Sequence, residues 1–557
     1  MRVSVCVLVF AAVTSCYGTP RAHAPDSGTG DIGGTGGAAG SSVGDGGMDT
    51  TATTCDAASP PAAPRLLRPM RGAYTGSLHA PTAMATLRPT FSWAAVAPTC
   101  DETTYEVQAD DSCSPGALDA CGFPSPELDA KNISALTYAP PTDLKVATTP
   151  PVGAFYAWRV RACDASTRCS AWSEVRYLHV GRVREDINGD GYGDLLALSN
   201  RGIEVYLGSS QFDVSAPSAT IKYVSYGAVP TFSGDVNGDG YGDFFGGTVY
   251  VPSSGQAPTL FFGGADVATP MTLILTKTAG GPSTMMQTTS AGDLNGDGFA
   301  DLIVQWGYIN TSPMTELRIF FGGATLANTP DLSIPGPYSS DYSLQRSGHV
   351  GDINGDGFED IALTAFDGPS RTGVVQFFAG GAHPTTVPAA AVATTNATYE
   401  IEPIGDVNGD GFDDALIVLA GTNYAMYRGA EVLPTKVSMT WIDATTSSAA
   451  GGFDIDRDGF SDFAVGTTNG AAAILYRGGV AEIGVAPNGL AHLLYSQTLG
   501  FSDHDGDGRP DFIGVSNVDS ATSTASIQWA GSDGSTNPRV VYCGLPTDAA
   551  FKGQLVR

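Results

Sequence analysis

A nine-residue, aspartate-rich motif recurs seven times in the last two thirds of this chain. The first copy, DINGDGYGD, runs from Asp186 to Asp194. Positions 1, 5 and 9 are Asp in every copy, position 3 is Asn or Asp, and position 6 is always Gly. The copies begin 48 to 59 residues apart, at Asp186, Asp235, Asp293, Asp352, Asp406, Asp454 and Asp503. A chain with this spacing must fold into repeated units, each of which presents one such loop.

Oxygen-bearing side chains at alternate positions are the donor set that calcium prefers, because this ion takes roughly six to eight oxygen ligands. Gly at position 6 allows a sharp turn, and position 7 would add its backbone carbonyl. Asp, Asn and Gly also favour Asx turns without a metal. Copies with at least three carboxylates each would repel strongly without a cation, so the motif predicts about seven structural calcium ions. Magnesium is disfavoured because it demands stricter octahedral geometry.

The predicted metal ligands are the side chains at positions 1, 3, 5 and 9 of each copy, and the copies are called loops 1 to 7 in chain order. These ligands are Asp186, Asn188, Asp190 and Asp194 in loop 1; Asp235, Asn237, Asp239 and Asp243 in loop 2; Asp293, Asn295, Asp297 and Asp301 in loop 3; Asp352, Asn354, Asp356 and Asp360 in loop 4; Asp406, Asn408, Asp410 and Asp414 in loop 5; Asp454, Asp456, Asp458 and Asp462 in loop 6; and Asp503, Asp505, Asp507 and Asp511 in loop 7. Asp instead of Asn at position 3 of loops 6 and 7 is expected to raise their calcium affinity.

Two loops depart from the pattern at side chains that are not expected to be ligands. Loop 6 has Arg457 at position 4, where the other loops have Gly. Loop 7 has Arg509 at position 7 and Pro510 at position 8. Position 7 is Tyr or Phe in the other six loops. These aromatic side chains are expected to pack into the core of their own unit.

Short apolar runs follow the loops, for example DLLAL (194–198) and DIALT (360–364), and a second run such as IFFGG (319–323) ends in glycines. Such runs between turn residues are typical of strands, and no helical periodicity separates the motifs. A period of about 50 residues suits a blade of four short strands. The chain is therefore expected to be all-β, with a seven-bladed β-propeller over residues 182–557.

The loop positions given above resemble the FG-GAP/VCBS repeat family, whose calcium-loop blades also form the head of integrin α-subunits. The resemblance covers residues 186–557. It implies a β-propeller and carries over the same loop side chains as calcium ligands. The chain contains no Arg-Gly-Asp adhesion peptide, so the partner biology of integrins does not transfer.

Residues 65–181 are expected to form a separate β-sandwich. Segments such as RPTFSW (88–93), TYEVQ (104–108) and SEVRYLHV (173–180) read as short strands between turn residues. The stretch resembles a fibronectin type III domain around Trp93, Trp158 and Trp172, which implies an Ig-like sandwich of about 100 residues. The three tryptophans are expected in its core.

The N-terminus is expected to direct export. Arg2 precedes an apolar run over residues 3–13 that is too short to span a bilayer. The run ends in Val-Thr-Ser-Cys16, which resembles the bacterial lipobox and implies lipidation of Cys16. Residues 1–16 would then be the signal peptide and residues 17–64, rich in Gly, Ala and Ser, a flexible tether. Tyr17 after the cysteine favours the outer membrane or cell surface, by resemblance to the enterobacterial sorting rule; an ordinary signal peptide with a secreted or periplasmic product is the alternative.

Export permits disulfides. Cys113 with Cys121 and Cys163 with Cys169 are the candidates, because each pair is close enough in sequence to close a small loop. The pairing of the other three cysteines of the mature chain, Cys55, Cys100 and Cys543, stays open.

The net charge of −29 argues against a nucleic-acid partner, which would require a basic surface. The expected function is that of a surface-anchored calcium-binding module for binding, adhesion or structure. Its ligand would be an unknown protein or glycan, and it would touch the membrane through the lipid anchor only. A secreted polysaccharide lyase or hydrolase on the same scaffold is the alternative. The histidines form no His-Glu-x-x-His motif or triad, so no catalytic residue is assigned and the chain is expected not to be an enzyme.

The two ends of the repeat array are expected to complete one another. Only residues 182–185 lie between the last expected sandwich strand and loop 1, which leaves no room for a first strand in the first unit. The C-terminal segment AFKGQLVR (550–557) is one strand too many for the last unit. This segment is therefore expected to pair beside residues 194–198 and close the ring, which removes unpaired strand edges.

Overall fold

The structure is a computed structural model, and the residues it describes lie within one compact unit, Pro60–Arg557. It describes residues 60–81, 84, 86–96, 103–199, 202–213, 216–222, 230–251, 255–276, 283–308, 315–337, 344–367, 372–394, 398–419, 423–442, 446–455, 457–467, 473–479, 499–515, 526–530 and 543–544. The predictions for Cys16, Cys55, Cys100, Asp456 and the segment 550–557 lie outside these residues.

The described secondary structure consists of β-strands with short 3-10 turns such as η2 (Leu118–Ala120), so the predicted all-β fold class is confirmed. Within the described ranges, no helix combines the length and the apolar character that crossing a bilayer requires.

The N-terminal part of the unit is a sandwich of two sheets. One sheet has the order β1-β3-β6, and the other has the order β2-β8-β7-β4-β5. The strands are β1 (Leu66–Arg68), β2 (Ala73–Thr75), β3 (Phe91–Trp93), β4 (Thr104–Asp110), β5 (Leu128–Ile133), β6 (Thr137–Tyr138), β7 (Ala154–Cys163) and β8 (Arg176–Val180).

Alternation along the strands creates the sandwich core. In β4, buried side chains alternate with partly exposed ones, as a strand with one covered face requires. Residues of both sheets join one hydrophobic cluster, in which Trp93 and Trp158 are fully buried. Disulfides link Cys113 to Cys121 and Cys163 to Cys169.

The expectation that Trp172 belongs to this core is wrong. Its side chain is only partly buried. The guanidinium carbons of Arg159 and Arg161 lie 4.4 and 4.5 Å from the centre of its ring. Cation–π contacts with two neighbouring arginines of β7 therefore hold this tryptophan at the surface of the sandwich.

The rest of the chain is a series of antiparallel strand groups, called units 1 to 7, each associated with one loop. Their strands are β9 (Leu195–Ser199), β10 (Gly202–Tyr206) and β11 (Ala219–Ile221) in unit 1; β12 (Thr231–Gly234), β13 (Asp243–Val251), β14 (Gly255–Phe261) and β15 (Thr272–Ile274) in unit 2; β16 (Ser283–Gly292), β17 (Asp301–Tyr308), β18 (Thr315–Phe320) and β19 (Leu332–Pro335) in unit 3; β20 (Leu344–Gly351), β21 (Asp360–Asp367), β22 (Thr372–Phe378) and β23 (Ala390–Thr394) in unit 4; β24 (Thr398–Gly405), β25 (Asp414–Leu419), β26 (Asn423–Tyr427) and β27 (Met439–Ile442) in unit 5; β28 (Thr446–Phe453), β29 (Asp462–Thr467) and β30 (Ala473–Tyr476) in unit 6; and β31 (Leu499–Ser502), β32 (Asp511–Val515), β33 (Ser526–Ala530) and β34 (Cys543–Gly544) in unit 7. A single bridge between Gly255 and Ser283 joins units 2 and 3 into one sheet.

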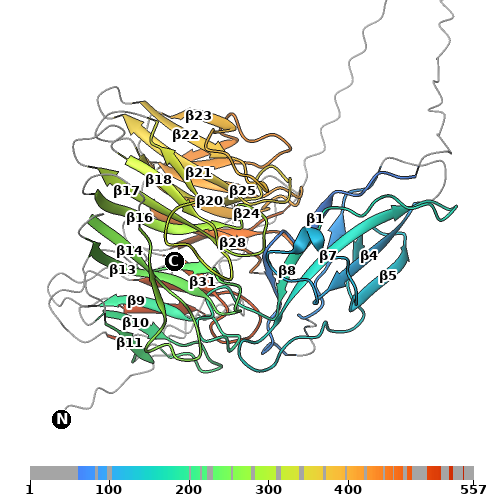
Figure 1. Ribbon diagram of the computed structural model, residues 1–557, viewed down its shortest axis with the longest axis horizontal. Coiled ribbons are helices and arrows are strands. Elements are labelled where there is room, and N and C mark those ends of the chain that lie inside the picture. Colours follow the sequence, from blue (N-terminus) through green and yellow to red (C-terminus); the bar gives the residue numbers. More distant parts are fainter. Residues whose placement is uncertain are drawn as a thin grey trace, which may run out of the picture. The chain divides into compact units, whose positions relative to one another are not determined.

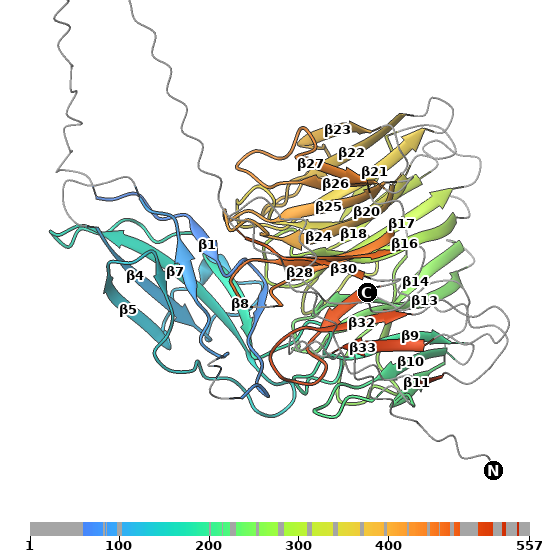
Figure 2. The ribbon, with the colours of Figure 1, turned by 180° about the vertical axis from the view of Figure 1, so that it is seen from behind.

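Consecutive units pack against one another (Figures 1 and 2). From unit 2 onward, the first strand of each unit contacts the first strand of the next. Separate hydrophobic clusters fill the spaces between neighbouring units, for example Phe245 and Trp306 between units 2 and 3. Burying a side chain of this size stabilises the fold by about 1.5–3 kcal/mol, so each interface contributes to the stability of both units.

A repeated backbone hydrogen bond also joins the units. The amide of position 8 donates to the carbonyl oxygen of position 1 in the preceding loop. For example, the amide of Gly242 donates to Asp186 at 2.7 Å, and that of Ser461 donates to Asp406 at 3.0 Å. The amide of Gly193 in loop 1 donates to Asp503 in loop 7 at 2.7 Å. The last unit is therefore hydrogen-bonded to the first in the same way as internal neighbours are.

The junction between units 6 and 7 is built differently. Position 8 of loop 7 is Pro510, which has no amide hydrogen to donate. The guanidinium of Arg457 in loop 6 instead donates to the carbonyl oxygen of Gly508 in loop 7. The two departures from the sequence pattern thus meet at one junction, where a side-chain hydrogen bond takes the place of the missing backbone one.

Unit 1 has three strands among the described residues, in the order β11-β10-β9. Its first strand does not come from β8, because β8 pairs with β2 and β7 inside the sandwich. The carbonyl of Glu185 accepts the amide of Asp194 at 3.0 Å, a single bond at the position where other units have a full strand. The expected pairing of residues 550–557 here stays a prediction.

Deleting residues 549–557 is expected to lower the Tm by about 5 °C, because the edge of β9 would lose its partner. Differential scanning calorimetry of the full chain and the truncated chain measures the effect. Deleting residues 20–58, which precede the compact unit, is the control and should leave the Tm unchanged. An equal Tm for the C-terminal truncation and the full chain would contradict the pairing.

Candidate metal centres

Each loop is wound so that its acidic side chains turn toward its own backbone. In loop 1, Asp186 Oδ2 accepts the amide of Gly191 at 2.6 Å, and Asp186 Oδ1 accepts the amide of Asp190 at 3.1 Å. Asp190 Oδ1 accepts the amide of Tyr192 at 3.1 Å, while its Oδ2 accepts the Asn188 side-chain amide at 2.8 Å. The side chains at positions 1, 3 and 5 are thereby brought together.

The bond from the position 6 amide to Oδ2 of position 1 recurs in every loop, with lengths of 2.6 to 2.9 Å. It requires a left-handed backbone at position 6, where φ lies between +81° and +94°. Only Gly adopts this conformation without strain, which explains why position 6 is Gly in all seven copies.

The aspartate at position 9 ties its loop to the strands of the same unit. In loop 1, Asp194 Oδ2 accepts the amide of Ile187 at 2.8 Å, and its Oδ1 accepts the amide of Gly208 at 2.8 Å. Gly208 follows the second strand, β10. The same two bonds are present in loop 2, where Asp243 accepts the amides of Val236 and Gly263. The ninth residue is therefore a structural anchor as well as a candidate ligand.

Burial makes these carboxylates costly to ionise. Burial is the main cause that raises the pKa of Asp186 to about 7 and that of Asp414 to about 8. Burial and the neighbouring Asp293 raise the pKa of Asp301 well above its ordinary value. A bound divalent cation would offset both the desolvation and the mutual repulsion of these groups.

The donor atoms present fit calcium. Among the described residues, Asp352 Oδ1 and Asp503 Oδ1 are buried oxygens that accept no hydrogen bond. In loop 7, carboxylate oxygens of Asp503, Asp505 and Asp511 lie within 4.8 Å of one another. Oxygen donors without a nitrogen or sulfur donor at positions 1, 3, 5 and 9 suit a hard cation. These residues would hold the ion, and the ion would supply charge neutralisation and crosslink the loop.

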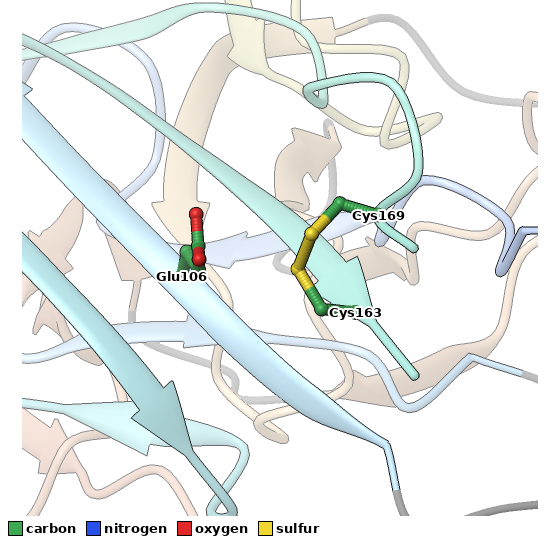
Figure 3. A group of neighbouring side chains, drawn as sticks. All are labelled: Glu106, Cys163 and Cys169. Carbon is green, nitrogen blue, oxygen red and sulfur yellow. A yellow bond between two sulfur atoms is a disulfide. The ribbon is translucent and has the colours of Figure 1, made fainter. Parts of the chain in front are cut away.

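Two other side-chain groups in the sandwich have metal-like spacing but a different explanation. Figure 3 shows Glu106 near Cys163 and Cys169, whose sulfur atoms are bonded to each other and so offer no thiolate. Glu106 itself pairs with the guanidinium of Arg161 at 2.6 Å. In the second group, Asp110 accepts hydrogen bonds from the backbone amides of Ser112 and Ser125, so its charge already has structural partners.

The aromatic side chains at position 7 do not pack into their own unit as expected. Each ring lies over the Gly at position 4 of the preceding loop. A Cβ atom on Gly238 would come within 2.4 Å of Phe299 Cε1, and one on Gly506 within 2.5 Å of Tyr192 Cε1. The ring contacts thus follow the same order around the units as the backbone hydrogen bonds, including the step from loop 7 to loop 1.

The exception falls at the junction between units 6 and 7. Position 7 of loop 7 is Arg509, so no aromatic ring is supplied to loop 6. Position 4 of loop 6 can therefore carry a side chain, and it is Arg457 with a φ of +61°. Both residues were recognised in the sequence as departures, but nothing in the spacing showed that they meet.

Sequence reasoning missed the arginines that the sandwich presents to the loops. Arg68 and Arg176 form ion pairs with the position 1 aspartates of loops 5 and 4. Arg68 and Asp406 are 338 positions apart in the chain. Neither arginine lies in a sequence motif. No local sequence signal could have identified them.

The charge at position 3 gives a direct test of the proposed ligand set. Asp505→Asn should lower the calcium affinity of loop 7 about tenfold, because it removes one ligand charge from the site. Isothermal titration calorimetry of the full chain measures this affinity. Asn188→Asp is the matched reciprocal variant and should raise the affinity of loop 1. If neither substitution changes the binding isotherm, the charge at position 3 does not set the calcium affinity of the loops.

Neighbouring antiparallel sheets joined through equivalent loops define a β-propeller. Residues 186–246 match the family model described as FG-GAP-like repeat, and residues 287–305 match the FG-GAP repeat. These two matched segments contain loops 1, 2 and 3. The fold is typical of a binding or structural module.

Similar solved structures include a complex described as BBS1N with ARL6DN, with 10% identity, a TM-score of 0.38, and coverage of 59% of this chain and 87% of that chain. Another is the Dos1 propeller, with 8% identity, a TM-score of 0.33, and coverage of 67% and 86%. A third is an α-L-rhamnosidase from Dictyoglumus thermophilum, with 14% identity, a TM-score of 0.19, and coverage of 62% and 40%.

Proposed function

We propose that this protein is a calcium-binding β-propeller of seven blades that acts as a binding, adhesion or structural module outside the cell. Each unit with its loop would be one blade, and the seven ions would be structural. The observation that supports the proposal is a hydrogen bond that all seven loops share. In each loop the backbone amide of position 6 donates to Oδ2 of the first aspartate. The carboxylates are thereby held in one arrangement whose negative charge a bound cation would balance.

The N-terminal sandwich is proposed to be a fibronectin type III-like domain, and the protein is proposed to be exported. Its disulfides, Cys113–Cys121 and Cys163–Cys169, support an oxidising compartment. Lipidation of Cys16 would anchor the chain to the outer membrane or cell surface. Its ligand would be a protein or a glycan, bound by the segments that connect the strands on one face of the propeller.

Calcium binding is tested with the purified chain, first stripped with a chelator and then titrated with calcium in a calorimeter. About seven ions per chain are expected, from one ion per loop. A titration with magnesium under the same conditions is the control and should give weaker binding. A chain that binds no calcium would refute the metal part of the proposal. Protein and glycan arrays probed with calcium and with chelator would then identify the ligand.

A polysaccharide-active enzyme is the second candidate, and one observation favours it. A cavity of about 1900 Å³ is lined by first strands of several units and contains Arg346, Glu400 and Glu402. A cavity with carboxylates and a cation could hold a polar chain such as a polysaccharide. Incubating the chain with a panel of polysaccharides, and analysing the products by chromatography, tests this candidate. Glu400→Gln and Glu402→Gln should abolish any cleavage; binding without cleavage would support the module instead.

A further inference from the structure

Arginines of the N-terminal part lie against the first aspartates of three loops. Arg68 Nη2 is 2.9 Å from Asp406 Oδ2 in loop 5. Arg176 Nη2 is 3.6 Å from Asp352 Oδ2 in loop 4, and both side chains are almost fully buried. The Nη1 atom of Arg182, just after β8, is 4.0 Å from Asp235 Oδ2 in loop 2. The sandwich thus meets the propeller over the loops that are the candidate metal centres.

A fourth arginine reaches loop 3 through its backbone. Arg71 Nη1 donates to the carbonyl oxygen of Gly296 at 3.0 Å. Its guanidinium carbon also lies 5.0 Å from the centre of the Phe358 ring, which packs over the same Gly296. Loop 1 meets the sandwich through a backbone amide of Val152 and the imidazole of His79 instead.

The ion pairs share one geometry. In loops 2, 4 and 5 the nearest guanidinium nitrogen approaches Oδ2 of the first aspartate, the oxygen that also accepts the position 6 amide. The other oxygen, Oδ1, is not used by the arginine. In Asp352 this Oδ1 is buried and accepts no hydrogen bond among the described residues. In Asp235 and Asp406 the Oδ1 atom accepts the backbone amides of positions 4 and 5 of its own loop. An arginine and a metal ion can therefore bind the same carboxylate through different oxygens.

The charges of the two cations are complementary. Loops 1 to 5 each have three aspartates at the ligand positions, which a divalent ion reduces to a net charge of −1. One arginine offsets that remaining charge in loops 2 and 5, whereas in loop 4 the charge of Arg176 is shared with Glu174, whose Oε1 lies 2.8 Å from Arg176 Nε. The charge balance affects stability most in loop 4, because Arg176 and Asp352 are buried and a buried charge without a partner is strongly destabilising. Neither the ion nor the arginine alone neutralises the ligand charge.

We propose that docking of the N-terminal sandwich and calcium binding by loops 2, 4 and 5 reinforce one another, with Arg182, Arg176 and Arg68 as the positioning residues. Each arginine attracts Oδ2 of the first aspartate, at 2.9 Å in loop 5 and at 3.6 and 4.0 Å in loops 4 and 2, and so favours an orientation in which Oδ1 faces the ion. Each ion fixes the loop that the arginine contacts. The inference rests on the proposed calcium binding. By linkage, anything that weakens one event weakens the other by the same factor.

The test compares calcium titrations of the full chain and of the double variant Arg68→Gln/Arg176→Gln. Two of the sites in the isotherm should weaken about tenfold, and the others should keep their affinity. Arg88→Gln is the matched control, because Arg88 pairs with Asp143 within the sandwich at 2.7 Å and should leave the isotherm unchanged. Arg68→Lys/Arg176→Lys keeps the charges and should recover most of the affinity, which separates a charge effect from misfolding.

A second experiment measures docking of the sandwich by its protection from proteolysis. Trypsin can cut after Arg182 and Arg184, between the sandwich and loop 1. Calcium should slow this cleavage in the wild-type chain about tenfold, and the double Gln variant should lose that protection. Cleavage that does not respond to calcium, or an isotherm of the double variant that matches or exceeds the wild type in affinity, would overturn the linkage. A wild-type chain that binds no calcium would refute the proposed function instead.

Discussion

Chelation of calcium should lower the Tm of this protein by about 10 °C or more. A site filled at one hundred times its dissociation constant stabilises the folded state by about 2.7 kcal/mol, and several sites add their contributions. The stripped chain would also keep its buried acidic groups without a balancing charge. Among these, Asp194, Asp243 and Asp360 have pKa values that burial raises well above the ordinary range. Their ionisation in the folded state therefore opposes folding unless a cation is bound.

Calorimetric scans in calcium, in chelator, and in chelator followed by excess calcium measure this effect. The third sample is the control, because recovery of the Tm shows that the loss came from the metal and not from the chelator. Ionic strength must be equal in all three, since screening changes the repulsion between carboxylates. A Tm that does not change on chelation would contradict structural calcium in the loops.

Replacing the position 4 glycine should destabilise the propeller by about 2–4 kcal/mol. Gly238 and Gly409 have φ values of +75° and +74°, where an alanine is strained. A new Cβ atom at either position would also lie 2.4 Å from an aromatic carbon of the next loop, in Phe299 or Phe460. The ring or the loop must therefore move, and the contact between neighbouring units is disturbed.

Urea unfolding of Gly238→Ala and Gly409→Ala measures the loss in the free energy of unfolding. Gly479→Ala is the control, because a Cβ atom there meets no other atom within 4 Å and its backbone is not in the left-handed range. That variant should be as stable as the wild type. Equal stability of all three variants would show that the ring contact across loops does not constrain position 4.

The sequence predicted those features that each repeat carries within itself. The all-β class, the strand after each loop and the tight turn at position 6 depend on residues close to one another in the chain. The apolar runs expected to be strands after loops 1 and 4, residues 194–198 and 360–364, overlap β9 (Leu195–Ser199) and β21 (Asp360–Asp367). The shared hydrogen bonds of the loops also follow from local pattern, because donor and acceptor are within five residues of each other.

The features that sequence reasoning missed are contacts between repeats or between domains. The ring of Phe299 packs over Gly238 in the preceding loop, 61 positions earlier in the chain. The sequence pattern predicts that Trp172 lies in the core, because large aromatic residues are usually buried, whereas in the structure two arginines contact its ring at the surface. The residues of such a contact have no fixed spacing, so a periodicity argument cannot find them.

The junction between units 6 and 7 gives the repeats an order. Any loop with Gly at position 4 can accept the aromatic ring of any other, so near-identical repeats could associate with the wrong neighbour, even in a second chain. Loop 6 has Arg457 in place of the Gly that lies under a ring in the other loops, and loop 7 has Arg509 in place of the aromatic residue. The two arginines therefore distinguish the last pair of repeats from the others. This difference favours closure of the ring within one molecule over exchange of repeats between molecules.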